Sequence, residues 1–191
     1  MSDRVARRRA EVRERIFTQA MRLFVERGFD AVTVAEIADA AEIAKGTFFT
    51  HFPSKRDIFR YLGEQLVDVM EKQAPTQGGA RHRIDTALNA AATWMEDNAD
   101  LARMMLQSRS FNFSSDIGSP SQQRFASLIT EALTLGVNSG ELRANLPISD
   151  AVVLIQGIWY VNVIQWAAST SDRPLKDYIH SALDIVFQGA E

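Results

Sequence analysis

Four polar side chains lie close together in residues 45–51 and are suited to recognising a polar partner. They are the ammonium group of Lys45, the hydroxyls of Thr47 and Thr50, and the imidazole of His51. On a helix these groups can face outward while Phe48 faces inward. A lysine ammonium suits the acceptor edge of guanine, and a threonine suits the methyl group of thymine. These residue types favour recognition of nucleic-acid bases, unless the segment is only a solvated helix surface.

Two short helices joined by a three-residue turn would carry these side chains. Thr33-Val34-Ala35-Glu36 matches a capping box, which predicts a helix from Val34 to about Ala41, and a second helix follows over about 45–51. A longer helix over 10–27, ended by Gly28, would brace the pair. The inward side would consist of Ile37, Ala38, Ala41, Ile43 and Phe48. This is helix-turn-helix geometry, whose second helix fits a major groove about 12 Å wide.

The segment from Thr33 to Phe52, followed by Ser54-Lys55, closely resembles the tetracycline-repressor (TetR) family. The resemblance covers residues 10–62 well, and the rest of the chain agrees in length, in helical pattern and in the loop at 140–143. It implies a homodimeric repressor that binds a double-stranded DNA operator through its amino-terminal domain and a small inducer through its carboxy-terminal domain. The positions that it assigns to DNA contact are Thr33, Ala35, Lys45, Gly46, Thr47, Phe49, Thr50, His51 and Lys55.

Three residues depart from the family pattern. Glu42 stands where a turn glycine is usual, and a left-handed backbone there strains a glutamate. Ala44 takes the place of a capping Ser or Thr, which forfeits about 1 kcal/mol of helix stabilisation. Phe49 replaces a tyrosine and lacks its hydroxyl. We expect this helix to be anchored more weakly on phosphates, and we hypothesise that the arginines before Ala10 compensate.

Charge is unevenly distributed along the 191 residues. Residues 1–60 carry 12 Lys or Arg against 9 Asp or Glu, whereas residues 61–191 carry 9 against 15. A basic region of this kind attracts a polyanion, unless the arginines are only a solvated tail. The chain has no Cys, and no apolar stretch follows the basic start, so neither a disulfide framework nor a secretory signal is expected. We therefore expect a cytoplasmic protein.

The rest of the chain predicts an all-α fold of about nine helices, because no run of alternating apolar and polar residues indicates a strand. A linker at 74–79 precedes helices expected near 81–97, 100–110, 121–137, 149–169 and 174–189, with an irregular segment over 111–119. We predict a helix-turn-helix domain with a basic amino-terminal arm over 1–54, and a helical ligand-binding and dimerisation domain over 55–191.

The penultimate helix is apolar on nearly all sides, since only Gln156, Asn162 and Gln165 interrupt residues 151–168. The run is short for a membrane span and three amides are costly in lipid, so no membrane association is expected. Burial all round predicts a partner chain, and the last helix adds an apolar stripe of its own. We therefore predict a homodimer through the last two helices, with two recognition helices on a near-palindromic operator.

Large, adaptable side chains concentrate in the central helices, where they could line an apolar cavity for the inducer. The residues assigned to ligand binding are Trp94, Met95, Met105, Gln107, Phe111, Phe125 and Tyr160. Gln107, Arg103 or Arg109 would add polar specificity for a mostly apolar small molecule. The segment 111–119 would act as a gate, unless it is only a mobile connection. Methionine and aromatic residues at helical spacing are also ordinary core residues, so packing without a ligand is the alternative.

Catalytic, metal and cofactor sites are not expected. The chain has no Gly-x-Ser-x-Gly elbow, no glycine-rich phosphate loop and no His-Glu-x-x-His motif. His51, His82 and His180 are too scattered in sequence to indicate a local metal site. The prediction is a ligand-responsive DNA-binding repressor. The alternative is a helical small-molecule carrier or interaction protein that binds no DNA.

Overall fold

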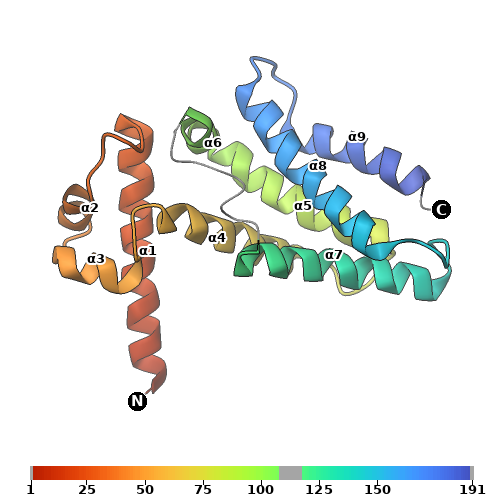
Figure 1. Ribbon diagram of the computed structural model, residues 1–191, viewed down its shortest axis with the longest axis horizontal. Helices are drawn as coiled ribbons and strands as arrows, with labels where there is room; N and C mark the ends of the chain where they lie inside the picture. The colour runs from red at the N-terminus through yellow and green to blue at the C-terminus, as the bar shows by residue number, and fades with distance from the viewer. Residues whose placement is uncertain (1, 108–117, 190–191) are drawn as a thin grey trace.

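The computed structural model describes residues 2–107 and 118–189, which form nine helices and no strand. A connecting helix joins the head of the molecule to its body, as Figure 1 shows. The head consists of α1 (Ser2–Arg27), α2 (Val34–Ala40) and α3 (Lys45–His51), and the connector is α4 (Asp57–Gln73). The body consists of α5 (Ala80–Asp97), α6 (Ala99–Gln107), α7 (Pro120–Ser139), α8 (Ile148–Ala168) and α9 (Leu175–Gln188). The predicted all-α fold is confirmed.

The helix ends in the head follow from local sequence. α1 ends where Gly28 adopts a left-handed φ of 81°. α2 begins at the predicted capping box, in which Thr33 and Glu36 each satisfy a backbone amide of the other. At the approach to α4, the amide and hydroxyl of Ser54 donate to Oδ2 of Asp57 at 2.8 and 2.7 Å. The stop at Gly28 and the start at Thr33 were expected from the sequence.

α1 is longer than the sequence pattern predicted. The helix was expected to begin near Ala10, but it begins at Ser2, so the early arginines form its first turns and not an extended arm. Arginine and alanine favour helix, and Arg7 pairs with Glu11 one turn later at 3.1 Å. Apolar periodicity marks only the part of a helix that packs, and residues 4–10 are exposed.

Two apolar cores lie at opposite ends of α4. The head core is built largely from α1, α2 and α3, and the body core largely from α5, α7, α8 and α9. α4 contributes Ile58, Tyr61 and Leu62 to the head core, but Val67 and Met70 to the body core. The connector therefore packs into both units, and a movement of α4 must disturb both. The expected domain boundary between residues 54 and 55 stays a prediction.

α5 is the central helix of the body and contacts α4, α6, α7 and α9. Its first turn is capped from a distant loop, because the carboxylate of Glu141 accepts the amide of Ala80 at 2.7 Å. α7 is tied to the connector by Arg124, whose guanidinium donates to Asp68 at 2.6 Å and to Glu71 at 3.0 Å. These two carboxylates raise the pKa of Arg124, so the link stays charged.

Helix bounds in the body lie close to those expected, with one exception at a cap. α8 begins at Ile148 and is not capped by Ser149 or Asp150. The carbonyl of Pro147 accepts the amides of Asp150 and Ala151 at 3.0 Å, so the proline takes the cap position. The helix expected over 100–110 is described as far as Gln107. Most of the segment 111–119 lies outside the described residues.

α8 is long and apolar enough to span a membrane, judged by length and composition alone. It packs against α6, α7 and α9. Its amides Gln156 and Asn162 are buried and donate to backbone carbonyls at 3.2 and 2.7 Å. Val153, Leu154 and Val161 on the opposite side are exposed. This arrangement fits a core helix with one uncovered apolar face better than a helix surrounded by lipid.

Candidate nucleic-acid interface

α2 and α3 form the predicted helix-turn-helix pair. The pair closes on four side chains that are at most 1% exposed, Ile37, Ala38, Ala41 and Phe48. In the turn Glu42 has a φ of 54°, and its amide donates to the carbonyl of Asp39 at 3.0 Å. The left-handed glutamate expected from the sequence is therefore confirmed. Ala44 precedes α3 without a side-chain cap, as expected.

The outer face of α3 presents Lys45, Gly46, Phe49 and Thr50, all of them exposed. The hydroxyl of Thr50 donates to the carbonyl of Gly46 at 3.2 Å, whereas Thr47 is half-buried. A Cβ added at Gly46 would meet no atom within 4 Å, so packing within the subunit does not require glycine there. Phe49 is 47% exposed, which leaves an aromatic edge free on a polar face. The face combines donors, acceptors and an apolar group, as base recognition requires.

His51 is turned partly toward the interior, although the sequence pattern placed it outward. It is half-buried, and its Nδ1 atom is buried with no hydrogen-bond partner among the described residues. Burial lowers the pKa of this imidazole, and the positive charges of Arg9 and Arg13 on α1 lower it further. His51 is therefore neutral at pH 7, and it lies at the end of α3 that is near the basic part of α1.

The entry of α2 is stabilised by a charged cap. The hydroxyl of Thr33 accepts the amide of Glu36 at 3.2 Å and donates to its carboxylate at 2.7 Å, while Arg27 pairs with that carboxylate at 2.9 Å. Hydrogen bonds from the Thr33 backbone and hydroxyl, and then from Arg27, lower the pKa of Glu36 to about 2. Thr33 therefore fixes the start of α2, and Ala35 remains exposed in its first turn.

Lys55 is engaged inside the head, although the family resemblance assigns it to a phosphate. Its ammonium donates to the carbonyls of Phe29 and Val32 at 2.6 and 2.7 Å and lies 4.2 Å from the centre of the Phe29 ring. Burial lowers the pKa of Lys55. These hydrogen bonds hold the loop between α1 and α2 in place.

The first turns of α1 add positive charge beside α3. Arg4, Arg8 and Arg9 are exposed, and α1 passes α3 and continues to the amino terminus (Figure 1). Because the charge of Arg9 acts on His51, the start of α1 and the end of α3 lie near one another. Exposed guanidinium groups at this place suit the phosphate backbone of DNA.

The expected ligand residues fall into two groups. Met95 and Phe125 are buried in the body core, and Trp94 and Tyr160 are half-buried against it, so the structure brings these four to one apolar cluster. Trp94 also packs on the head core. Nothing is described of the side chains of Met105 and Gln107 in α6, and Phe111 lies outside the described residues. The assignment of all seven residues to ligand binding stays a prediction, and so does the alternative that they are ordinary core residues.

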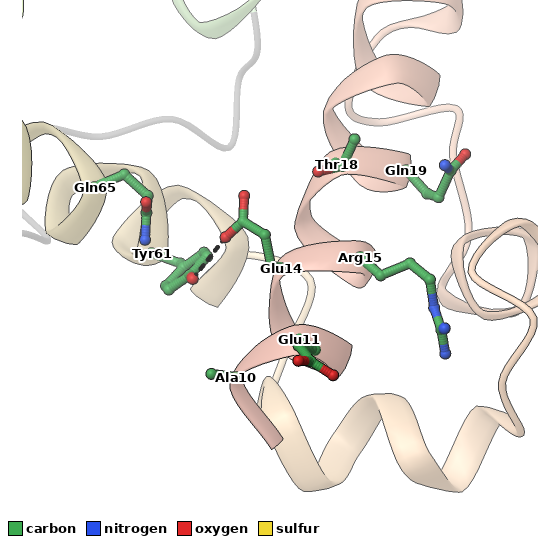
Figure 2. A pocket seen from close by; sticks show the side chains of 8 residues that line it. All are labelled: Ala10, Glu11, Glu14, Arg15, Thr18, Gln19, Tyr61 and Gln65. Atoms are coloured by element: carbon green, nitrogen blue, oxygen red, sulfur yellow. Dashed lines mark hydrogen bonds between the residues drawn. The ribbon is translucent and has the colours of Figure 1, made fainter. Parts of the chain in front are cut away.

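A cleft of about 570 Å³ lies between α1 and α4 (Figure 2). Its lining consists of Ala10, Glu11, Glu14, Arg15, Thr18, Gln19, Tyr61 and Gln65. Across it the hydroxyl of Tyr61 donates to Glu14 at 2.8 Å, and burial together with this carboxylate raises the pKa of Tyr61. None of the expected ligand residues lines this cleft. No sequence signal marked it, because α1 and α4 meet only in the fold.

The chain is similar to known bacterial transcriptional regulators. The family of bacterial regulatory proteins named tetR matches residues 16–62. The chain is 25% identical to the HTH-type transcriptional repressor KstR2 of Rhodococcus jostii (strain RHA1), over 86% of each chain. It is 22% identical to the fatty acid metabolism regulator protein of Bacillus subtilis (strain 168), over 91% of this chain and 93% of that one.

Two solved structures are similar along nearly their whole length. One is the transcriptional regulator FadR from Bacillus subtilis in complex with stearoyl-CoA, with 23% identity, a TM-score of 0.75, and coverage of 93% of this chain and 99% of that one. The other is the TetR family repressor FadR of Thermus thermophilus in complex with lauroyl-CoA, with 26% identity, a TM-score of 0.71, and coverage of 93% and 94%.

The matched region coincides with the head and the start of α4, where the exposed face of α3 lies. The relatives named above are transcriptional regulators and not enzymes. The chain belongs to the TetR family of bacterial regulatory proteins and is a DNA-binding transcriptional regulator.

Proposed function

We propose that this protein is a homodimeric repressor that binds a near-palindromic operator and leaves it when its body binds a small, mostly apolar molecule. The observation that carries the proposal is the exposed outer face of α3, held by a head core that continues into α4. Because its target is chromosomal DNA, it acts in the cytoplasm.

The exposed residues of α3 divide by chemistry into two roles. The ammonium of Lys45 suits guanine, and the Phe49 edge and the Thr50 methyl suit thymine methyl groups. Gly46, with open space above it, lets the backbone approach a phosphate, and the half-buried Thr47 contacts the DNA at the rim. Lys55, Thr33 and His51 support this face from behind, and Ala35 lies beside the DNA backbone.

The dimer forms through uncovered apolar faces of α8 and α9. Val153, Leu154 and Val161 of α8 are at least 60% exposed, and Ile185 of α9 is 74% exposed. Positions 153, 154, 157 and 161 lie on one side of α8, because a helix turns once every 3.6 residues. Exposed apolar side chains gathered on one helix face mark an interaction surface. A two-fold axis through this face pairs two copies of α3 for half-sites about 34 to 36 Å apart, or a multiple of this.

The inducer is an acyl-CoA thioester. Two similar structures are named as complexes with stearoyl-CoA and lauroyl-CoA, and their fold is that of this chain. An acyl chain needs an apolar lining, and Trp94, Met95, Phe125 and Tyr160 supply one in the body core. Trp94 packs on both cores, so a ligand that moves it also acts on the head. A preference of about 3 kcal/mol for the released conformation would weaken operator binding about 150-fold.

DNA binding is tested on the DNA that flanks the gene of this protein, by fluorescence anisotropy over a series of salt concentrations. We expect tight, salt-dependent binding that is lost in Lys45→Ala/Thr47→Ala. Lys72→Ala, which removes an exposed lysine at the far end of α4, is the matched control and should bind normally. Retained binding in the double variant would contradict the role of α3. If the unmodified protein does not bind this DNA either, a carrier without a DNA target is favoured.

The inducer is tested on the protein–operator complex with stearoyl-CoA, lauroyl-CoA and free CoA. Acyl-CoA should release the operator and free CoA should not, because only the acyl chain reaches the apolar core. If acyl-CoA binds by calorimetry but operator affinity is unchanged, the repressor mechanism is wrong. If acyl-CoA does not bind at all, the ligand class is wrong and DNA binding stands.

A further inference from the structure

A polar cluster joins α1 to α4 at the edge of the head core. The guanidinium of Arg13 makes two bonds to the Glu64 carboxylate, at 3.0 and 3.4 Å. It also lies 4.1 Å from the centre of the Tyr61 ring. Tyr61 in turn donates its hydroxyl to Glu14 of α1 at 2.8 Å, as Figure 2 shows. Two side chains of α1 and two of α4 are therefore connected at one point.

The same guanidinium reaches the end of the recognition helix. It lies 5.4 Å from the ring of Phe52, the fully buried residue that directly follows α3. Phe52 packs on the Tyr61 ring at 5.7 Å and on the Phe48 ring at 5.7 Å. A continuous series of ring contacts thus leads from Arg13 and Tyr61 into α3.

Arg13 differs from the exposed arginines that precede it on α1. Its guanidinium is engaged within the subunit in two ways: it pairs with the Glu64 carboxylate, and it stacks on the rings of Phe52 and Tyr61. Its Nε atom is buried and has no hydrogen-bond partner among the described residues. A desolvated donor of this kind is costly, and it is retained where the group holds a structure in place. Arg8, in contrast, is exposed.

We propose that Arg13 is a positioning residue for operator binding, which fixes the carboxy-terminal end of α3 against α4 and does not itself contact DNA. The planar guanidinium suits this role because it pairs with a carboxylate through two bonds and stacks on rings at the same time. Removing it leaves α3 attached by its apolar face alone, so the helix samples orientations that do not fit the groove. The effect is a loss of affinity without the loss of a phosphate contact.

The test compares operator affinity and its salt dependence in Arg13→Gln, Arg13→Lys, Glu64→Gln and the double variant Arg13→Gln/Glu64→Gln. Arg22→Gln is the control, because Arg22 is an exposed arginine of α1 whose bonds to described residues all lie within its own helix. We expect Arg13→Gln and Glu64→Gln each to bind about tenfold more weakly, with the slope of log K against log salt unchanged. The double variant should be no weaker than the singles, and Arg13→Lys should remain impaired.

A different pattern would overturn the proposal. If Arg13→Gln reduces the salt slope by about one and Arg13→Lys restores affinity, Arg13 is a phosphate contact. If Arg13→Gln and Glu64→Gln both bind as the unmodified protein does, the cluster has no role in operator binding. Thermal melting checks folding, and Glu64→Gln decides the question alone if Arg13→Gln does not fold, because it leaves Arg13 in place. No ligand is added, so the result is independent of the proposed inducer.

Discussion

Replacing Glu42 by glycine should stabilise the protein, because the backbone at this turn is one that glutamate adopts at a cost. Its φ of 54° lies in the left-handed region, and its side chain is exposed. For a residue with a Cβ this conformation costs about 1 to 2 kcal/mol. Glycine adopts it freely. The bonds of the turn, from Glu42 to Asp39 and from Ile43 to Ala38, both use backbone atoms and are kept.

The gain is smaller than the strain that is relieved. Glycine also gives the unfolded chain more freedom, which costs about 0.5 to 1 kcal/mol on folding. The balance for Glu42→Gly is a stabilisation of about 0.5 to 1 kcal/mol. For a chain of this length, that corresponds to a rise of about 1 to 4 °C in Tm.

The assay is thermal and urea denaturation at one fixed protein concentration, since dimer stability depends on concentration. Glu42→Gln removes only the charge, and Glu42→Ala removes the side chain but keeps the Cβ. Both should be no more stable than the unmodified protein. If Glu42→Gly does not exceed Glu42→Gln, or if Glu42→Ala gains as much as Glu42→Gly, strain at this turn is not the cause.

Three further outcomes follow from surfaces and charges described above. Val153→Asp/Val161→Asp should raise the dimer dissociation constant at least about 100-fold in sedimentation velocity, because each subunit would bury two carboxylates in place of apolar groups. The control Val25→Asp on α1 should leave the dimer intact. Deleting residues 1–9 should lower operator affinity and flatten its salt dependence, and unchanged binding would refute a phosphate role for these arginines. The pKa of His51 lies below its ordinary value of 6.5, so the unfolded chain binds a proton first as pH falls. Stability should therefore drop below about pH 6.5 in urea melts, and less so in His51→Asn; an equal drop in both proteins would exclude His51 as the cause.

Local rules in the sequence were sufficient for the helix-turn-helix pair. The capping box at Thr33, the left-handed Glu42 and the uncapped Ala44 each depend on residues within one turn of the chain, and the structure confirms all three. The inward position of Phe48 followed from helical period alone. Recognition of the family rested on the same segment, which is why the comparisons match it there.

Periodicity failed where a helix has no partner to pack against. The first turns of α1 carry arginines and almost no apolar residues, so no stripe marked their helix. The helix depends there on intrinsic propensity and on the pair Arg7–Glu11. The positive charge of these arginines alone could not show whether residues 2–9 form an extended arm or a helix.

The sequence by itself determined the helices, their order, and the helix that carries the DNA-binding residues, because those properties follow from spacing along one chain segment. Only the tertiary structure decided which polar groups are free. Lys55 is held by two carbonyls of a loop that precedes it by more than twenty residues, and Arg13 is paired with Glu64 on a different helix. The spacing of residues in sequence cannot reveal such partners, because the chain brings them together only when the head core and α4 pack.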